Sequence, residues 1–337
     1  MKEKTNFSIV MPLYNSKSTL EKAIKSILSQ SYKNYELIIV DDCSTDGSYE
    51  IVKKFATENK KITSYRMEKN KGASYCRNFG IKRANYEWIG SVDSDAIETK
   101  NWLKIINSNI DKNTGVIGGK CVHAYPKNAG YFIKVFYYIE SSQFPDTDQI
   151  YNKGNYNEPY CLASANLFFT KDVFNKNKGF NEVIRAGEDR LFVCDAIENG
   201  FTVKFLANSV VYHPLYNCKN ILDIFRRSII FNKWRVFILK KCNLVSKKYK
   251  IIDYFLILLF IYIVIGTTVM GFRNIVFLTS ILSLSSIVIL IFHIHLKKHV
   301  PYKYTFGYIL IEIIKKILGV YIYLFKLKPT NLDWKKR

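Results

Sequence analysis

The residues of this chain best placed to do chemistry are two aspartates in the segment Tyr86–Ala96, which reads YEWIGSVDSDA. The apolar run Trp88–Val92 is typical of a short buried strand, and it ends in Asp93-Ser94-Asp95. On extended backbone, side chains at i and i+2 point to the same side, so the two carboxylates are expected to lie together. Mg²⁺ and Mn²⁺ take such oxygen ligands along with substrate phosphates. Asp-x-Asp also occurs by chance in solvated loops, so the rest of the chain has to decide.

The bulk composition limits the class of protein. The 337 residues suffice for one large domain or two smaller ones. The 50 Lys and Arg against 28 Asp and Glu leave a net charge of +22, which favours nucleic acid, phosphates or acidic lipid as a partner. The first ten residues, MKEKTNFSIV, contain no long apolar run, so we expect no secretory signal peptide. The seven cysteines include no CxxC pair, which indicates reduced thiols in a cytosolic domain.

Apolar runs alternate with amphipathic segments through the first part of the chain. The expected elements are strand Phe7–Met11 closed by Pro12, helix Thr19–Gln30, strand Tyr35–Val40, a helix to about Glu58, and strand Ile62–Met67. This β-α-β-α-β order predicts right-handed crossovers and an open, mostly parallel α/β sheet.

Polar residues follow the predicted strands at their carboxyl ends, where open α/β sheets bind ligands. Pro12–Asn15, Asp41-Asp42 and Asp93–Asp95 all fall there. Asn70-Lys71-Gly72 then opens a helix whose free backbone N–H groups suit phosphate, and Arg77 adds positive charge. An ordinary glycine turn with a solvated arginine explains the same residues equally well.

The segment after the aspartate pair has a less regular pattern. The expected elements are strand Gly115–Val122, helix Tyr131–Ile139, a mobile polar loop Asp146–Asn157, strand Pro159–Thr170, and short strands Val203–Leu206 and Val210–Tyr212. Asp189 should begin a helix, where the helix dipole alone also favours an acid. His213 follows the last strand and is either structural or a third metal ligand.

From Asn220 onward the chain changes character. Ile221–Lys241 is amphipathic and basic, as in a helix at a membrane surface. Tyr254–Gly271 and Ile275–Leu296 lack charged side chains and are long enough to span a hydrocarbon core of about 30 Å. Lysines flank the outer ends of this predicted hairpin, so the positive-inside rule places both ends in the cytoplasm. Phe306–Phe325 is apolar but carries Glu and Lys side chains, which favours an interfacial helix.

These patterns divide the chain into four parts. The expected parts are an α/β domain over 1–218, a basic interfacial helix and linker over 219–250, a transmembrane hairpin over 251–298, and an interfacial helix and tail over 299–337. The expected location is therefore the cell membrane, crossed more than once, with the α/β domain in the cytoplasm.

Six motifs, in order over roughly residues 5–215, make the chain resemble the family-two glycosyltransferases. They are Met11-Pro12-Leu13-Tyr14-Asn15, Asp41-Asp42-Cys43-Ser44-Thr45-Asp46-Gly47, Asn70-Lys71-Gly72 with Arg77-Asn78 and Gly80, Asp93-Ser94-Asp95, Ser164-Ala165-Asn166, and Gly187-Glu188-Asp189. The resemblance implies a GT-A fold, which is Rossmann-like with a mostly parallel mixed sheet. It also implies a nucleotide-sugar donor with a preference for UDP, Mn²⁺ or Mg²⁺ as cofactor, and inversion at the anomeric carbon.

The same resemblance implies residue roles. The donor-binding residues would be Pro12, Tyr14, Asn15, Asp42, Asn70, Gly72, Arg77 and Asp93. Among them, Asp42 would hold the nucleotide base and Asp93 the ribose side. Asp95 would bind the metal, with Asp93 and His213 as further ligands. Asp189 would be the general base that takes the proton of the acceptor hydroxyl, and Glu188 is the next candidate.

Two departures from the family pattern bear on the product and the acceptor. Processive polysaccharide synthases of this family carry Gln-x-x-Arg-Trp before their membrane segments, whereas Ile230–Trp234 keeps only the tryptophan. This favours transfer of single sugars over polymerisation. The usual Gly-Ala-Asn is Ser-Ala-Asn at Ser164. A membrane tail at the cytoplasmic face suggests a lipid-linked acceptor, such as a polyprenyl phosphate, and an anionic lipid partner.

Other functions fit less well. A nucleic-acid-binding protein would explain the charge, but the membrane segments already give the basic flanks a lipid partner. A dinucleotide oxidoreductase requires GxGxxG after the first strand, where this chain reads MPLYNS. A membrane-anchored protein that binds nucleotide sugars without catalysis has the same sequence features as the enzyme.

Overall fold

The computed structural model of the protein describes residues 4–123, 125, 128–155, 162–184, 186–213 and 220–241. The chain divides into two compact units. The first consists of residues 1–126 and 143–216, and the second consists of residues 127–142 and 217–337. Within the described residues, no helix has the length and apolar character that crossing a bilayer requires. The predicted transmembrane runs and the predicted helix Phe306–Phe325 lie outside these residues.

The first unit alternates strands and helices, as the sequence predicts. Its elements are β1 (Phe7–Leu13), α1 (Lys17–Leu28), β2 (Tyr35–Asp41), α2 (Ser48–Glu58), β3 (Ile62–Arg66), α3 (Ala73–Ile81), β4 (Trp88–Ser91), β5 (Ile97–Glu98), α4 (Trp102–Asn109), β6 (Thr114–Val122), β7 (Gln149–Tyr151), the 3₁₀ turn Ser164–Asn166, β8 (Leu167–Thr170), α6 (Lys171–Lys176), α7 (Glu188–Glu198) and β9 (Thr202–Tyr212).

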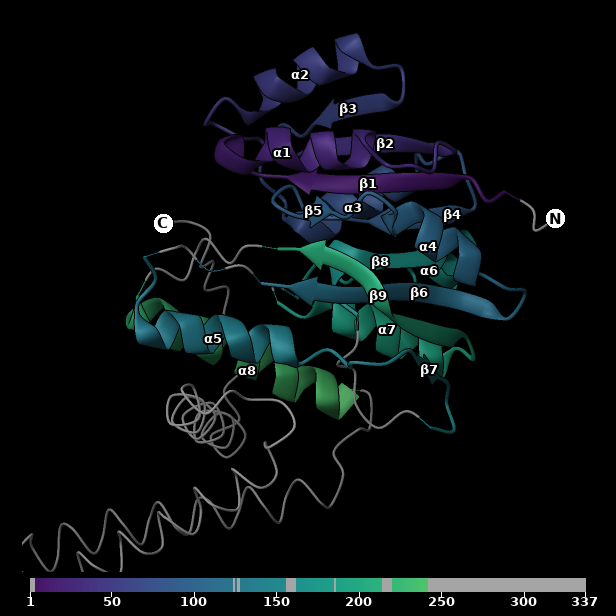
Figure 1. Ribbon diagram of the computed structural model, residues 1–337, viewed down its shortest axis with the longest axis vertical. Helices are drawn as coiled ribbons and strands as arrows, with labels where there is room; N and C mark the ends of the chain where they lie inside the picture. Colours follow the sequence, from purple (N-terminus) through teal and green to yellow (C-terminus); the bar gives the residue numbers. More distant parts are fainter. Residues whose placement is uncertain are drawn as a thin grey trace, which may run out of the picture. The chain divides into compact units, whose positions relative to one another are not determined.

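One mixed sheet organises this unit (Figure 1). Within the described chain its strand order is β3-β2-β1-β4-β8-β6-β9-β5, and β7 also pairs with β9. Strands β1 to β4 are parallel to one another, whereas β8 runs antiparallel to both β4 and β6. Ser91 at the end of β4 therefore pairs with Leu167 at the start of β8. As a result, the carboxyl ends of the parallel strands and the turn that precedes β8 meet at one edge of the sheet.

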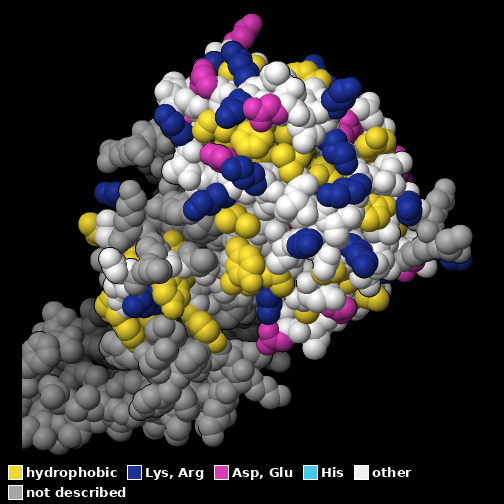
Figure 2. Space-filling view, turned by 45° about the horizontal axis from the view of Figure 1, so that its top comes forward, with side chains coloured by type: hydrophobic (Ala, Val, Ile, Leu, Met, Phe, Trp, Pro, Cys, Tyr) yellow, Lys and Arg dark blue, Asp and Glu magenta, His cyan; other side chains and the backbone are white. Residues whose placement is uncertain are grey.

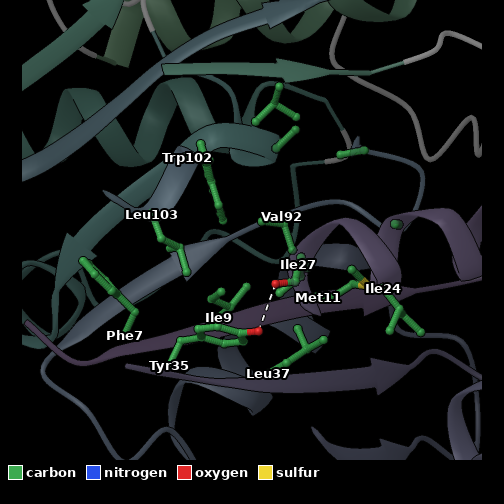
Figure 3. Close-up of a cluster of buried hydrophobic side chains, with 14 of the residues drawn as sticks. Phe7, Ile9, Met11, Ile24, Ile27, Tyr35, Leu37, Val92, Trp102 and Leu103 are labelled. Carbon is green, nitrogen blue, oxygen red and sulfur yellow. Dashed lines mark hydrogen bonds between the residues drawn. The ribbon is translucent and has the colours of Figure 1, made fainter. Parts of the chain in front are cut away.

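Helices cover both faces of the sheet because the strand side chains alternate. Phe7, Ile9 and Met11 of β1 point into a fully buried cluster that also receives Ile24 of α1 and Trp102 of α4 (Figure 3). In the same cluster, the Tyr35 hydroxyl donates a hydrogen bond to the Ile27 carbonyl at 2.9 Å. On the opposite face, α3 lies close against β1 and β2: a Cβ at Gly80 would meet Val10 Cγ1 at 2.6 Å.

The first strand is longer than predicted, because it passes through Pro12 and ends at Leu13. A proline in a central strand normally leaves a gap in the hydrogen-bond ladder. Here the pairing of β1 with β4 stops at Val10 and Ser91. The Pro12 nitrogen points toward the β4 side of β1, as the Val10 backbone does, but it lies beyond the last residue of β4. The missing N–H therefore removes no hydrogen bond between β1 and β4.

The predicted strand Pro159–Thr170 is wrong in its extent: the strand begins only at Leu167, after the 3₁₀ turn Ser164–Asn166. The two short strands predicted between Val203 and Tyr212 are one strand, β9, with an irregularity in its pairing to β6 after Leu206. The Asn166 amide donates to the Ser209 carbonyl at 2.9 Å and to the Lys120 carbonyl at 3.2 Å, which supports the irregular segment.

Two glycines of β6 allow this close approach of backbones. A Cβ at Gly118 would lie 2.2 Å from the Asn166 carbonyl oxygen, and one at Gly119 would lie 2.1 Å from the Ser209 carbonyl oxygen. Both distances are far below van der Waals contact, so only glycine fits without moving the backbone. The turn before β8 and the irregular part of β9 are thereby held against β6.

The remaining differences from prediction concern short elements. The predicted loop Asp146–Asn157 contains the three-residue strand β7. The elements β5, α4 and α6 were not predicted, because they have only two to eight residues. In the second unit, the predicted helices are present as α5 (Tyr131–Ser142) and α8 (Ile221–Lys241), which lie side by side in Figure 1.

Candidate functional site

Three of the predicted metal ligands converge at the carboxyl edge of the sheet. Asp93 and Asp95 follow β4, and His213 follows β9. The His213 Nε2 atom lies 3.2 Å from Asp93 Oδ2 and 3.2 Å from Asp95 Oδ1. One ligand atom from each residue lies within 4.8 Å of the others, which is the arrangement of a three-ligand cation site.

The aspartates lie on one side for a different reason from the predicted one. Asp93–Ala96 is a turn closed by a hydrogen bond from the Ala96 N–H to the Asp93 carbonyl at 3.1 Å, not an extended strand end. The Ser94 hydroxyl points the other way and lies 2.8 Å from the Ser16 hydroxyl at the start of α1. The Ser94–Ser16 contact thus fixes the turn at the start of α1, and the Asp93 and Asp95 carboxylates both face His213.

The electrostatics of this trio favour a cation. Burial by itself lowers the pKa of His213, but the carboxylates of Asp95 and Asp93 outweigh it and raise the pKa to about 10. A proton on the imidazole therefore provides the positive charge that the two carboxylates require. A divalent ion bound at Nε2 would take over that role and release the proton. The oxygen-rich donor set suits Mg²⁺ or Mn²⁺, so the residues fit the predicted cofactor.

Arg77 links the aspartate pair to the start of α7. Its Nη2 donates to Asp93 Oδ1 at 2.7 Å, and its Nη1 donates to Glu188 Oε1 at 2.9 Å. Nη2 also donates to the Ser164 hydroxyl at 2.9 Å. The Arg77 side chain is only 3 % exposed, so the guanidinium holds together three chain segments inside the protein. Its predicted contact with a donor phosphate stays a prediction.

Glu188 and Asp189 have different surroundings although they are neighbours. Burial raises the pKa of Glu188, and the adjacent Asp189 raises it further, while Arg77 opposes both effects. Asp189 accepts hydrogen bonds from the Ser164 backbone N–H at 3.0 Å and from the Arg190 N–H at 2.7 Å. Gly187, with φ of 85°, precedes this first turn of α7. Asp189 is thus held in one orientation at the predicted start of its helix.

Apart from Arg77 and Asp93, which lie at the metal trio, the predicted donor-binding residues gather at the ends of β1 and β2. Both Asp42 carboxylate oxygens accept backbone N–H groups, from Lys71 at 2.7 Å and from Gly72 at 2.8 Å. The Asn70 amide lies 3.4 Å from the Asp42 carbonyl. These bonds fix the turn before α3 against the end of β2, whose last residue is Asp41.

Asn15 joins the other two predicted loops. Its N–H donates to the Ser44 hydroxyl at 3.0 Å, and its side-chain oxygen accepts from the Thr45 N–H at 2.9 Å. Its φ of 47° lies in the left-handed region, which asparagine tolerates better than most residues. The prediction brought Pro12, Tyr14 and Asn15 to this edge, and the structure places Pro12 inside β1 and the other two directly after it.

Sequence reasoning missed two parts of the site. It did not foresee that Glu188 and Ser164 share the Arg77 guanidinium, since these partners are 111 and 87 residues away from Arg77. It also did not foresee Glu98, a buried carboxylic acid on β5 near the metal trio. Burial raises the pKa of Glu98 to about 8, and the Ser26 hydroxyl donates to it. The sequence around Glu98, DAIETK over residues 95–100, is largely polar and gave no signal that this side chain is buried.

Comparison with known proteins gives a family model and several curated relatives. The model described as "Glycosyl transferase family 2" matches residues 8–175. Glycosyltransferase GlyG of Streptococcus pneumoniae is 33 % identical over 138 residues, which are 41 % of this chain and 44 % of that protein. Poly(ribitol-phosphate) beta-N-acetylglucosaminyltransferase TarS of Staphylococcus aureus is 27 % identical over 214 residues, 61 % of this chain and 35 % of that protein. The chain thus spans less than half the length of these two relatives.

Solved structures support the fold. The mannosyltransferase PcManGT from Pyrobaculum calidifontis, in complex with GDP-Man and Mn²⁺, superposes with a TM-score of 0.65. That match covers 97 % of this chain and 89 % of the other at 13 % identity. S. aureus TarS 1–349 in complex with UDP-GlcNAc gives a TM-score of 0.54 at 20 % identity, covering 95 % of this chain and 92 % of the other. At these identities the likeness concerns the fold alone, which is GT-A-like.

Proposed function

Because residues 8–175 form a glycosyl transferase family 2 domain, we propose that this chain transfers a single sugar from a nucleotide-sugar donor to an acceptor with inversion at the anomeric carbon. The observation that carries the proposal is the placement of Asp189 next to the Asp93, Asp95 and His213 trio, joined to it through Arg77 and Ser164. Asp93, Asp95 and His213 suit the binding of a cation with a diphosphate, and Asp189 suits the removal of a proton.

The chemistry follows from these placements. Asp93, Asp95 and His213 would hold Mn²⁺ or Mg²⁺, and the ion supplies neutralisation of the charge on the leaving diphosphate. Asp189 accepts the proton of the acceptor hydroxyl as that oxygen attacks the anomeric carbon from the face opposite the diphosphate. The two hydrogen bonds to Asp189 leave lone pairs free on its oxygens, and they keep the carboxylate from rotating away.

The proposed donor is a UDP-sugar, with Asp42 beside the base. The TarS structures in complex with UDP and with UDP-GlcNAc support this choice of nucleotide. The PcManGT complex holds GDP-Man, so related folds accept more than one base. Nucleotide binding to the purified protein, compared across UDP and GDP, tests the assignment directly.

The proposed acceptor is lipid-linked, and the proposed place is the cytoplasmic face of the cell membrane. Support comes from the uncharged runs Tyr254–Gly271 and Ile275–Leu296 with their lysine flanks, and from the net charge of +22. On the face shown in Figure 2, Lys and Arg side chains are spread among acidic and hydrophobic ones. A spread charge of this kind suits a broad anionic lipid surface better than one compact ligand.

Membrane association is tested by washing membranes that contain the full chain with alkaline carbonate. A spanning hairpin keeps the chain in the pellet, and protease added from the cytoplasmic side then digests the family 2 domain, whereas protease added from outside does not. Release of the full chain into the carbonate wash contradicts the spanning hairpin. It does not test the proposed sugar transfer.

The activity is tested with the full chain in detergent, Mn²⁺ or Mg²⁺, a panel of UDP-sugars and membrane lipid extract. We expect UDP release that depends on the acceptor and a lipid product heavier by one sugar in mass spectrometry. A ladder of longer products identifies a processive synthase instead. Donor binding with no UDP release on addition of any lipid extract identifies a non-catalytic binder and overturns the proposal.

A further inference from the structure

Arg77 holds an unusual position between the two halves of the candidate site. It reaches Asp93 Oδ1 at 2.7 Å on one side and Glu188 Oε1 at 2.9 Å on the other. Asp93 presents its second oxygen, Oδ2, to His213. The guanidinium thus occupies one oxygen of Asp93 and leaves the other for the cation site. The planar guanidinium of arginine has several N–H donors in fixed directions, so it can fix the orientation of the Asp93 carboxylate. A lysine ammonium acts as one point charge and cannot fix an orientation in this way.

Ser164 completes the link to Asp189. Its hydroxyl accepts from Arg77 Nη2 at 2.9 Å, while its backbone N–H donates to Asp189 Oδ2 at 3.0 Å. Ser164 is buried, and it lies in the 3₁₀ turn that the β4–β8 pairing brings to the end of β4. The family that the chain resembles usually has glycine here, which has no hydroxyl to offer.

We propose that Arg77 and Ser164 are positioning residues that set the distance and orientation between the metal ligand Asp93 and the general base Asp189. This inference rests on the function proposed above. Transfer requires the attacking oxygen, held near Asp189, to line up with the anomeric carbon, held by the donor diphosphate at Asp93 and Asp95. A displacement of about 1 Å between such groups costs roughly 100-fold in rate. A bridge of three short hydrogen bonds through buried atoms resists that displacement.

The same contacts do not require a role in catalysis, since a buried arginine must find partners in any protein. The two interpretations differ in what they predict. A purely structural network lowers the melting temperature and the amount of folded protein, while the folded fraction turns over normally. A positioning network weakens Mn²⁺ binding through Asp93. At saturating Mn²⁺ it lowers kcat in protein that is fully folded, with little change in donor KM.

Two variants of the full chain separate these outcomes. Ser164→Ala removes the hydroxyl but keeps the backbone N–H that holds Asp189, so we expect kcat to fall about 10-fold with donor KM within about twofold. Arg77→Lys keeps the charge but loses the fork, so we expect a fall of about 100-fold in kcat and a weaker Mn²⁺ affinity by electron paramagnetic resonance. Arg83→Lys is the matched control, because Arg83 is exposed and stacks on Phe79 just past the end of α3.

The measurements are melting temperature, donor affinity, Mn²⁺ affinity and steady-state kinetics for each variant. Because both residues act in one network, the double variant should lose no more than about the larger single effect. Folded variants with wild-type kcat and wild-type Mn²⁺ affinity overturn the proposal, and if Arg77→Lys does not fold, Ser164→Ala decides. If the wild-type chain transfers no sugar, the proposed function fails, whereas unchanged Mn²⁺ affinity in Arg77→Lys counts against the positioning role alone.

Discussion

Carboxylates outnumber cations at the candidate site. Asp93, Asp95, Glu188 and Asp189 lie around one guanidinium and one imidazole, and the proton on His213 makes up part of the deficit. Like charges brought together in a partly buried place repel one another unless a cation joins them. The arrangement therefore has an affinity for positive charge, which a divalent cation would satisfy.

Asp95 gives the most direct test of the cation. Chelation with EDTA should abolish transfer by the wild-type chain, and added Mn²⁺ or Mg²⁺ should restore it. Asp95→Ala should lower kcat/KM at least about 100-fold. Mutation of a residue that only hydrogen-bonds to a metal ligand already lowers metal affinity or activity roughly 10- to 100-fold, and loss of a ligand itself should cost more. Neither ion should rescue this variant at high concentration. Full wild-type activity in EDTA, or an unaffected Asp95→Ala, contradicts the assignment of the metal site.

Asp189 gives the corresponding test of the base. Asp189→Asn keeps the size and can still accept from the Ser164 N–H, so we expect a stability loss of about 1 kcal/mol or less. Loss of a general base should lower the single-turnover rate roughly 10²- to 10⁴-fold. Donor affinity should stay near wild type, because the base acts on the acceptor. A nearly normal rate would transfer the role to Glu188, which is the weaker candidate because its carboxylate is already paired with Arg77.

Glu98 should make the stability of the protein depend on pH. Burial raises its pKa from 4.5 to about 8, and Asp93 raises it while Ser26 and His213 lower it. A carboxyl group with a raised pKa binds its proton more tightly in the folded state. Its contribution to stability is therefore complete below about pH 4.5 and is lost as the pH rises toward 8.

The test is Glu98→Gln, which imitates the protonated acid at every pH. Relative to wild type, the variant should change little in unfolding free energy at pH 5 and gain stability at pH 8. The gain is on the order of a few kcal/mol, at about 1.4 kcal/mol per pKa unit. Chemical denaturation at the two pH values measures it. A wild-type-minus-variant difference that is the same at pH 5 and pH 8 means that Glu98 is not protonated when folded.

At the scale of elements, the long, regular segments were predictable and the short ones were not. An apolar run identified β2 to within one residue at each end, since a strand buried on both faces needs no other signal. The edge strand β3, in which only Ile62 is buried, was also predicted to within one residue. The two-residue β5 and the 3₁₀ turn at Ser164 depend on partners far along the chain, which local patterns do not contain. The candidate carboxylates were found by type and spacing, whereas the buried bridge through Arg77 required the tertiary structure.

The glycines of β6 make a prediction at this scale. Gly119→Ala places a Cβ 2.1 Å from the Ser209 carbonyl, so the backbones of β6 and β9 must separate. Overpacking of this kind costs about 1–3 kcal/mol, and the end of β9 that carries His213 should shift with it. We expect a lower melting temperature and weaker Mn²⁺ binding. Gly130→Ala is the control, because a Cβ there meets nothing within 4 Å. Equal melting temperatures for the two variants would contradict the close approach.

At the scale of the whole molecule, the chain separates into the unit that contains the sheet, residues 1–126 with 143–216, and a unit that contains α5 and α8. The first of these units is expected to recognise the donor by itself, since the predicted donor-binding residues and the metal trio all lie in residues 1–126 and 143–216. The long uncharged runs lie in the sequence of the other unit, so the proposed function would place lipid binding and catalysis in different stretches of the chain.

The reversal of strand direction between β4 and β8 has a consequence for how such enzymes diversify. The parallel strands β1 to β4 come from one continuous stretch of chain, and the Ser164, Asp189 and His213 segments come from a later one. In the proposed function, recombination near Glu98 would therefore exchange Asp189 and the metal ligand His213, while the predicted base-binding loops, Asp93 and Asp95 are inherited together. A chimera with residues 1–98 of this chain and the remainder of a relative should keep the donor sugar of this chain and adopt the acceptor of the relative. Mass spectrometry of its product checks both, and a donor preference that follows the later segment would show that the two halves do not evolve separately.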